Sequence, residues 1–241
     1  AEAIADFSAA IERVADDVPS YAGRARAHAR LGQWEQAVSD MTRALELRPG
    51  EPSYLLARAR YVDELGKTDA AIADLDAIIP LAPTAEVFLA RAEIRERTGD
   101  LAGALEDLNS AVAQEPENAE AFRVRGAFYE RQGDVEQALR DYREAVRLAP
   151  DLAWAHLRLA QIHRQQEDLA AAEQSLSMVI ALQPADPEAY IQRAKVRLET
   201  RQLSEALSDL AAAEQLNPEL PEIYLTRARV NRLNGRNEAA I

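Results

Sequence analysis

The sequence contains no cysteine, only 9 glycines, and 5% aromatic residues in a chain of 241. Without cysteine the protein has no disulfide framework, no thiolate zinc site and no cysteine nucleophile. No apolar run approaches the ~18 residues that a membrane span requires. These absences exclude a disulfide-stabilised fold and argue against insertion of this segment into a membrane.

Positive charge is also scarce, with 28 Lys and Arg against 41 Asp and Glu and a net charge of −13. An acidic surface repels phosphate backbones and anionic lipid, which disfavours nucleic acid and membrane as partners. The chain also lacks a glycine-rich phosphate loop, a Gly-x-Ser-x-Gly elbow, a His-Glu-x-x-His pair and a calcium loop. We therefore expect no catalysis, no cofactor and no metal.

The residues that are present repeat with a period of 33 or 34. Prolines, glycines and small residues each follow this period, and apolar residues recur every three or four positions between them. Each unit reads as a helix, a turn with glycine, a second helix and a turn with proline. The proline column is Pro49, Pro83, Pro116, Pro150, Pro184 and Pro218, and the alanine column is Ala37, Ala71, Ala104, Ala138, Ala172, Ala206 and Ala240.

Neither helix of such a unit buries its apolar stripe alone, so the units must stack on one another. The pattern resembles the tetratricopeptide repeat family, which has this period, a small residue at the eighth place, alanine at the twentieth and proline at the thirty-second. The resemblance implies an all-α fold, a right-handed α-solenoid in one continuous domain. Its predicted parts are the second helix of a partial repeat at 1–17, six full repeats at 18–51, 52–84, 85–118, 119–152, 153–186 and 187–220, and a truncated repeat at 221–241.

The sequence shows no polar capping helix at either end of this array. Uncovered repeat ends expose apolar faces, which solenoids normally cover. We therefore expect a segment of a longer bacterial protein. The alternative is that the exposed ends pair in a homodimer.

The seventh place of the repeat is occupied by arginine and the twenty-third by aspartate in most units. The repeat at 153–186 has Leu159 and Ser175 instead, so both residues are lost together. The joint loss predicts an Arg–Asp ion pair within each repeat, because removing one partner of a buried pair strands a charge. An anion-binding stripe is the alternative. The arginines are Arg24, Arg58, Arg91, Arg125, Arg193 and Arg227, and the aspartates are Asp6, Asp40, Asp74, Asp107, Asp141 and Asp209.

Two repeats depart from the pattern. Pro80 falls inside the expected second helix at 52–84, where it removes a backbone donor, so we expect a shortened or kinked helix and a change of pitch by Thr84. The repeat at 153–186 lacks the glycine and has Glu167 there. It also contains His156 and His163, two turns apart, which we interpret as packed core residues rather than metal ligands.

The resemblance implies that the first helices line a concave groove that binds a protein or peptide. Carried over place by place, the groove has 11 basic and 10 acidic side chains. We therefore expect a partner with an apolar stripe and mixed charges. The predicted groove residues are Leu56, Arg60, Leu89, Glu93, Arg123, Trp154, Leu157, Arg158, Gln161, Ile191, Lys195, Leu225 and Arg229.

The Arg/Asp repeat type resembles bacterial arrays of this family. Some of those are periplasmic parts of outer-membrane exopolysaccharide exporters, where they recruit polysaccharide-modifying enzymes, and this resemblance favours the periplasm over the cytoplasm. A cytoplasmic assembly or co-chaperone-like scaffold is one alternative, although the places of the chaperone-binding clamp contain no Asn. A surface that guides the polysaccharide itself, motivated by Trp154, is the other.

Overall fold

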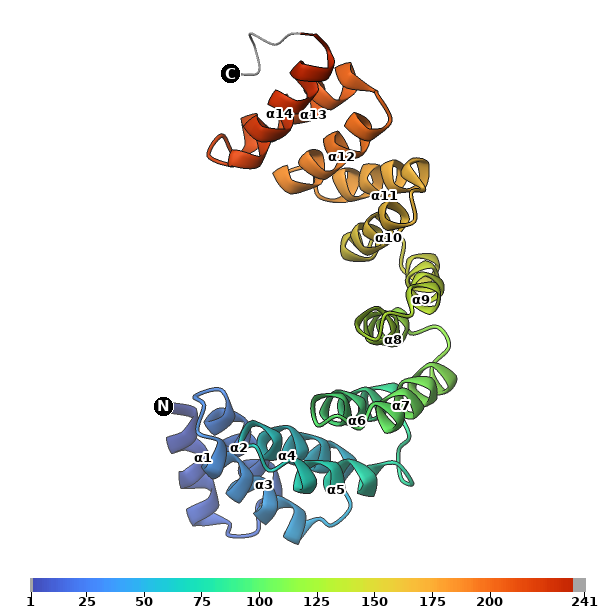
Figure 1. Ribbon diagram of the computed structural model, residues 1–241. Coiled ribbons are helices and arrows are strands. Elements are labelled where there is room, and N and C mark those ends of the chain that lie inside the picture. Colours follow the sequence, from blue (N-terminus) through green and yellow to red (C-terminus); the bar gives the residue numbers. More distant parts are fainter. Residues whose placement is uncertain (1, 236–241) are drawn as a thin grey trace. The chain divides into compact units, whose positions relative to one another are not determined.

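The computed structural model describes residues 2–235, in which every regular element is an α-helix (Figure 1). This part of the chain has fourteen helices and no strand, which confirms the all-α solenoid. The first helices of successive repeats are α2 (Val18–Ala29), α4 (Pro52–Glu64), α6 (Ala85–Arg97), α8 (Ala119–Arg131), α10 (Ala153–Gln165), α12 (Pro187–Glu199) and α14 (Pro221–Leu233). The second helices are α1 (Glu2–Arg13), α3 (Trp34–Leu47), α5 (Thr68–Ile78), α7 (Leu101–Gln114), α9 (Val135–Leu148), α11 (Leu169–Leu182) and α13 (Leu203–Leu216).

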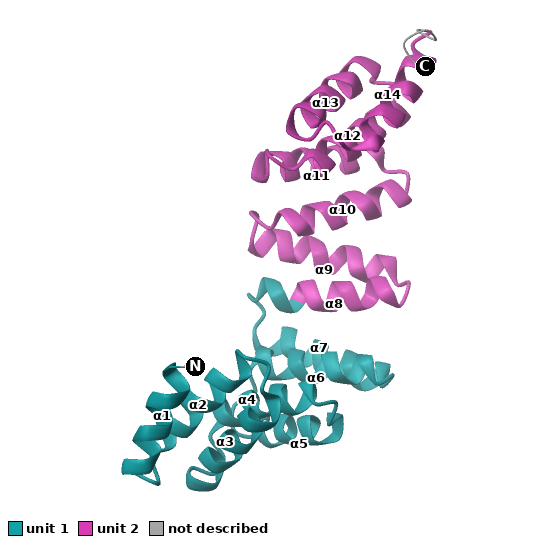
Figure 2. Cartoon of the chain, turned by 90° about the vertical axis from the view of Figure 1, so that its left-hand side faces the viewer, with its two compact units in different colours: residues 1–121 teal, residues 122–241 magenta. Residues whose placement is uncertain are grey.

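The chain divides into two compact units, residues 1–121 and 122–241, with the boundary inside α8 (Figure 2). Within each unit, a helix packs mainly on the helices that precede and follow it in sequence. The predicted start of a second helix in the last repeat, with Ala240, lies outside the described residues. No helix in residues 2–235 is long and apolar enough to cross a bilayer.

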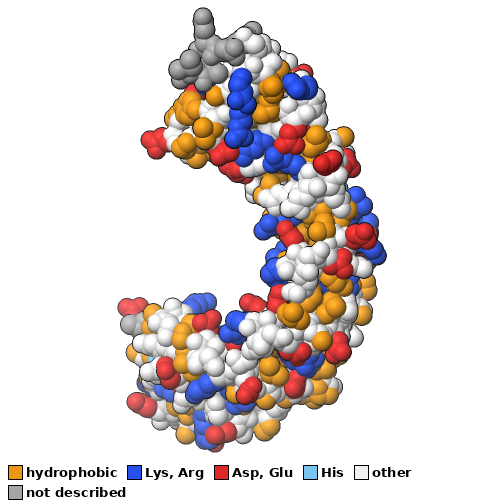
Figure 3. Space-filling view, viewed as in Figure 1, with side chains coloured by type: hydrophobic (Ala, Val, Ile, Leu, Met, Phe, Trp, Pro, Cys, Tyr) orange, Lys and Arg blue, Asp and Glu red, His pale blue; other side chains and the backbone are white. Residues whose placement is uncertain are grey.

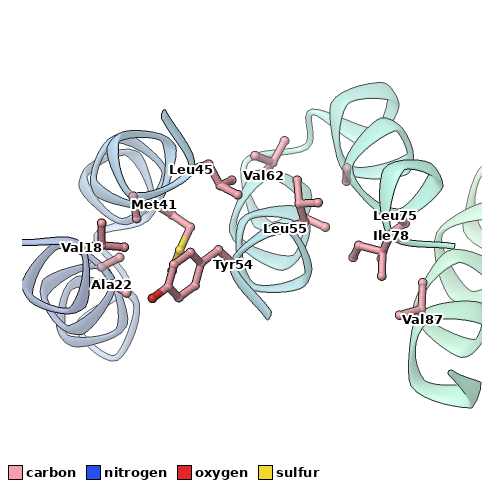
Figure 4. Close-up of a cluster of buried hydrophobic side chains, with 14 of the residues drawn as sticks. Val18, Ala22, Met41, Leu45, Tyr54, Leu55, Val62, Leu75, Ile78 and Val87 are labelled. Carbon is pink, nitrogen blue, oxygen red and sulfur yellow. The ribbon is translucent and has the colours of Figure 1, made fainter. Parts of the chain in front are cut away.

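The core of unit 1 is a row of buried side chains between successive helices (Figure 4). Large residues such as Met41 and Leu75 are fully buried, and each lies in the same cluster as the small residues Ala25 and Ala59. Small residues let two helix backbones approach, and the large residue fills the remaining space. The small and large columns of the sequence therefore form the packing between the two helices of each repeat.

The turns between first and second helices use a left-handed backbone residue. Gly133 has φ 79°, for which glycine carries no steric cost. Two repeats place a residue with a side chain in this conformation, Glu167 at φ 61° and Arg201 at φ 65°. A left-handed conformation costs an L-residue about 1–2 kcal/mol, so these two turns are strained relative to the glycine turns.

Pro80 shortens the second helix of its repeat, as predicted. Helix α5 has 11 residues and ends at Ile78, whereas α3 and α7 have 14 each. Proline lacks the amide proton that would continue the helical hydrogen bonds, and its ring clashes with the preceding turn. The change of pitch toward Thr84 stays a prediction.

Candidate functional site

The Arg–Asp pairs predicted from the sequence are present within the repeats. In each, the arginine Nε and Nη2 donate to the two carboxylate oxygens of the aspartate, at 2.5–3.0 Å. The aspartates are buried. The guanidinium groups thus face the inside of the repeat, which confirms the structural clamp over an anion-binding stripe. The pairs are Arg24–Asp40, Arg58–Asp74, Arg91–Asp107, Arg125–Asp141 and Arg193–Asp209.

The same arginines also link neighbouring repeats, which the sequence analysis missed. The remaining nitrogen, Nη1, donates to a side-chain oxygen on the second helix of the preceding repeat. The links are Arg24 to Ser8 (3.0 Å), Arg58 to Thr42 (3.4 Å), Arg91 to Asp76, and Arg193 to Ser177 (3.0 Å). The sequence does contain a pattern for these links, because side chains with acceptor oxygens recur at one place of the second helix in the preceding repeat. At that place before Leu159 the chain has Arg143, so a basic residue replaces the acceptor where the clamp is missing.

The two histidines of the outlier repeat have separate structural contacts. His156 Nε2 lies 3.0 Å from the carbonyl oxygen of Pro150, in the turn before its own helix. His163 is 7% exposed, and its Nε2 lies 3.3 Å from Nη2 of Arg143, while its Nδ1 has no hydrogen-bond partner. Within residues 2–235, no group of three or more His, Asp or Glu side chains is placed to hold a metal ion. Both histidines are therefore buried residues of the repeat core.

We expect His163 to make the stability of unit 2 depend on pH. Burial lowers the pKa of His163 and the charge of Arg143 lowers it further, while Asp168 and a backbone group oppose the shift. The unfolded chain therefore takes up a proton near pH 6.5 that the folded chain does not bind. We expect stability to be full above about pH 7 and to fall as pH drops through 6.5 toward the folded pKa. In His163→Val, which copies Val62 in the second repeat, this part of the pH dependence should vanish.

Urea unfolding of wild type and His163→Val at pH 5.5 and 7.5, followed by circular dichroism, measures this contribution. If the buried neutral histidine is the cause, the free energy of unfolding of wild type should fall more between pH 7.5 and pH 5.5 than that of His163→Val. A difference that is equal at both pH values contradicts the assignment.

A hollow of about 460 Å³ lies on the first-helix side of unit 2, around Trp154. Three helices form it, and we call it the Trp154 pocket. The Trp154 ring meets Tyr142 edge to face with centroids 6.1 Å apart, and the Arg123 guanidinium lies 5.5 Å from the centre of the Trp154 ring. Its lining residues are Arg123, Ala127, Glu130 and Arg131 of α8, Tyr142 of α9, and Trp154 and Arg158 of α10.

The polar groups of this pocket are held in place by one another. The Tyr142 hydroxyl donates to Glu130 at 2.7 Å, and the other carboxylate oxygen of Glu130 lies 3.8 Å from Arg158. Burial, followed by the hydrogen bond to Glu130, raises the pKa of Tyr142 well above its usual range. Tyr142 therefore remains a neutral hydrogen-bond donor, and Glu130 is already engaged inside the pocket.

A second hollow of about 410 Å³ adjoins it along α10 and reaches α12. Its floor is aliphatic and its rim has three side-chain amides, so we call it the glutamine pocket. Arg164 at its edge donates to Glu199 at 2.5 Å and 3.0 Å. The lining residues are Leu157, Ala160, Gln161, Arg164, Gln165, Leu176, Gln192 and Val196.

The two pockets meet at one turn of α10. Arg158, which lines the Trp154 pocket, donates to Gln161 of the glutamine pocket at 3.1 Å. Because Trp154, Leu157, Arg158 and Gln161 all come from this helix, α10 contributes to both hollows. The pockets therefore share one face of unit 2, which we call the first-helix face.

The predicted groove residues fall into separate groups. Arg123, Trp154, Leu157, Arg158 and Gln161 line the two pockets of unit 2. Farther along this unit, Leu225 and Arg229 are exposed and Lys195 is half-buried. In unit 1, Leu56 and Leu89 are half-buried and Arg60 and Glu93 are exposed.

Ile191 is the exception, because the structure buries it completely. It is 0% exposed and lies in one core cluster with Ala194, Leu210 and Ile223. Helix α14 packs directly against α12, so the fifth place of this repeat is covered by the next first helix. Ala22, at the same place in the first repeat, is likewise buried, in the cluster that contains Tyr54 (Figure 4). Both side chains are therefore enclosed in the core and do not form part of the exposed first-helix face.

Ion pairs between neighbouring first helices neutralise part of the charge on this side of the repeats. In unit 1, Arg60 pairs with Glu86 at 2.6 Å and Arg97 with Asp63. In unit 2, Lys195 of α12 pairs with Glu222 of α14 at 2.9 Å. Such exposed pairs contribute about 0–1 kcal/mol each, so they serve to order the face more than to stabilise the fold.

Comparison with known proteins agrees with this architecture. No curated protein sequence matches the chain at a significant level. The C-terminal part of a TPR repeat-containing protein from Cytophaga hutchinsonii has a TM-score of 0.75 at 16% identity, covering 90% of each chain. A chain of the Cut9–Hcn1 hetero-tetramer of the APC/C has a TM-score of 0.60 at 16% identity over 95% of this chain, and this chain spans 45% of its length. YrrB, described as a TPR protein with an unusual peptide-binding site, has a TM-score of 0.51 at 16% identity and coverage of 90% and 95%.

At such identities these structures are informative about the fold alone. The sequence itself provides the family assignment, because two models of one family together match most of the chain. One profile, described as tetratricopeptide repeat, matches residues 22–86 and 89–153, and the other, with the same description, matches residues 129–196. The chain is therefore a member of the tetratricopeptide repeat family.

Proposed function

We propose that this protein is a non-catalytic scaffold whose first-helix face in unit 2 binds a segment of a partner protein. Tetratricopeptide repeats commonly serve in protein–protein interaction, and the family membership supports that general class. The observation that carries the proposal is the pair of adjoining hollows on α8, α10 and α12. A single globular ligand site would be one enclosed cavity, whereas two shallow hollows in sequence suit an extended segment.

The chemistry of the glutamine pocket supports a peptide ligand. Leu157, Leu176 and Val196 provide an aliphatic floor for an apolar side chain. The amides of Gln161, Gln165 and Gln192 stand around it and can exchange hydrogen bonds with a peptide backbone. Apolar anchors surrounded by a polar rim are the usual organisation of a protein interface.

Peptides selected by display from a random 12-residue library test this proposal. We expect Leu157→Asn to weaken the selected peptides at least about tenfold, because a polar group replaces the apolar floor. Met178→Asn is the matched control, since Met178 is exposed in the same repeat but lines neither pocket. Fluorescence polarisation with labelled peptides gives the affinities, and circular dichroism confirms that both variants are folded. Equal effects of the two substitutions contradict the proposal.

We infer the biological setting from the resemblance to bacterial arrays alone. There, a scaffold of this kind would recruit a polysaccharide-modifying enzyme to an exopolysaccharide exporter in the periplasm. The partner identified with this protein should then be an enzyme that acts on the polymer. Co-purification of the full-length protein with such an enzyme, lost in Leu157→Asn and kept in Met178→Asn, supports that setting, and loss in both variants contradicts it.

A further inference from the structure

The first and last helices of the described residues are complementary halves of one repeat. Within residues 2–235, α1 is a second helix with no first helix before it, and α14 is a first helix with no second helix after it. Neither kind of helix buries its apolar stripe alone. In the repeats between them, the first helix packs on the second helix of the same repeat. The open sides of α1 and α14 therefore correspond to the two halves of that packing.

The two helices also match residue by residue. Asp6 and Phe7 of α1 stand at the twenty-third and twenty-fourth places of the repeat, and Arg227 and Ala228 of α14 stand at the seventh and eighth. In other repeats, the seventh and twenty-third places form the Arg–Asp clamp, and the eighth and twenty-fourth form the packing between the two helices. By sequence, residues 236–241, which lie outside the described residues, reach only the twenty-first place. Helix α1 thus has the side chains that the repeat of α14 requires.

The side chains of α1 at these places are incompletely covered. The helix has no fully buried residue. Phe7 stands against Gly23 of α2 but is only half-buried, whereas Met41 at the same place is 0% exposed. Asp6 is exposed and has neither an ion pair nor a hydrogen bond within residues 2–235, whereas Asp40 is buried in its clamp. The contacts missing from α1 are those of a first helix of its own repeat.

The corresponding side of α14 is uncovered as well. Ala228 is half-buried, although Ala194 at the same place is 0% exposed. Tyr224 and Leu225 are 46% and 59% exposed, whereas Ile191, at the place of Leu225, is covered by α14 itself. In Figure 3, hydrophobic and basic side chains lie next to one another over the α14 end of unit 2. This end therefore presents an apolar surface that a further helix pair would bury.

The charges of the two helices are opposite. Arg227 donates through Nη1 and Nη2 to Glu214 of the preceding helix, at 3.3 and 2.5 Å. Its Nε, which donates to the aspartate in the other clamps, has no hydrogen-bond partner within residues 2–235. Helix α1 has a net charge of −2, from Glu2, Asp6, Glu12 and Arg13, and α14 has a net charge of +2, from Glu222, Arg227, Arg229 and Arg232.

We propose that the chain associates with further copies of itself head to tail, with α1 of one copy packed on α14 of another as the second helix of its repeat. Asp6 of the second copy then completes the clamp at Arg227, and its Phe7 lies against Ala228. The opposite charges favour this orientation over pairing of two like ends. Because the interface joins two different surfaces, copies continue to add until the ends meet in a ring or a longer row forms. This association goes beyond the proposed peptide binding and does not involve the pockets of α10.

Sedimentation velocity of the full 241-residue chain over a range of concentrations tests the association. Physiological salt is suitable, because a Debye length of about 8 Å screens the overall repulsion between copies with a net charge of −13. We expect the average mass to rise above that of one chain as concentration increases. The mass of a single chain at every concentration would overturn the proposal.

One substitution at each end blocks the interface from either side. Asp6→Arg opposes two arginines, and Ala228→Glu inserts a long side chain where two helix backbones approach. Each should raise the dissociation constant at least about tenfold. Glu106→Arg and Ala102→Glu are the matched controls, since they make the same changes at exposed places of α7, and they should stay within about twofold. Circular dichroism confirms that all four variants are folded.

A mixture of the two blocked variants distinguishes head-to-tail association from pairing of like ends. Asp6→Arg keeps an intact α14 and Ala228→Glu keeps an intact α1, so each alone should be monomeric while the mixture forms a dimer that does not grow. Pairing of α14 with α14 would instead leave Asp6→Arg dimeric by itself, and pairing of α1 with α1 would leave Ala228→Glu dimeric. Either of these results, or a mixture that stays monomeric, contradicts the proposal.

Discussion

Asp107→Ala should lower the free energy of unfolding by about 4 kcal/mol. Asp107 is 1% exposed and accepts hydrogen bonds from Arg91 through both carboxylate oxygens and from Arg95 through one. Truncation removes the buried carboxylate from two partly buried guanidinium groups, which keep only the more exposed carboxylates of Asp76 and Asp100 as partners. Urea unfolding followed by circular dichroism measures the loss, and hydrogen exchange localises it to the repeat at 85–118.

The clamp at Arg58 and Asp74 provides the matched comparison. Its eleventh place is Val62, so Asp74 has only one arginine partner in its own repeat. Asp74→Ala should therefore cost less than Asp107→Ala. The double change Arg58→Leu/Asp74→Ser copies the natural combination of Leu159 and Ser175 and should recover part of the loss. If the double variant is much less stable than Asp74→Ala, the pair is not the stabilising unit that we infer.

Gly126→Ala should destabilise unit 2 by about 1–2 kcal/mol, although alanine is normally the better helix former. A Cβ atom at Gly126 would lie 2.9 Å from Cε1 of Tyr142 and 3.2 Å from the Cβ of Asp141. Tyr142 is fixed by its hydrogen bond to Glu130 and its contact with Trp154, so it cannot move aside freely. Thermal or urea unfolding measures the change.

In a Tyr142→Leu background, Gly126→Ala should no longer lower the free energy of unfolding. In the other full repeats the small place is alanine and the large place is leucine or methionine, as in Ala92 and Leu108, so Gly126 and Tyr142 represent a joint exchange of volume. In the Tyr142→Leu background, Gly126→Ala should be neutral or stabilising, because the clash with the tyrosine ring is gone, the contact with Asp141 is the one that Ala92 and Asp107 tolerate at the same places, and helix propensity remains. An equal loss in both backgrounds would falsify the steric explanation.

Much of the fold could be predicted from the sequence because each repeat supplies the same information again. Period, helix pairs and the shortened α5 follow from the columns and from Pro80, and these predictions are confirmed. The Arg–Asp clamp was predictable for a different reason, since Leu159 and Ser175 depart from the pattern together. Two residues that depart from the repeat pattern in the same repeat indicate a contact between their places, which two unbroken columns would not indicate.

The site was less accessible to sequence reasoning. The place of a residue in the repeat does not determine how closely the next first helix covers it, so Leu157 lines a pocket while Ile191 is buried. The links from Arg58 to Thr42 and from Arg91 to Asp76 were missed because they join places in different repeats.

The junction between the repeats at 119–152 and 153–186 lacks the arginine link that joins other neighbouring repeats. Leu159 stands where other repeats have the linking arginine, and it packs in an apolar cluster with Leu139, Tyr142 and Ile162. Apolar contacts weaken on cooling, because their driving force near room temperature is the entropy of water. Polar links lack this dependence. We therefore expect cold to weaken this junction more than the junctions that also have an arginine link.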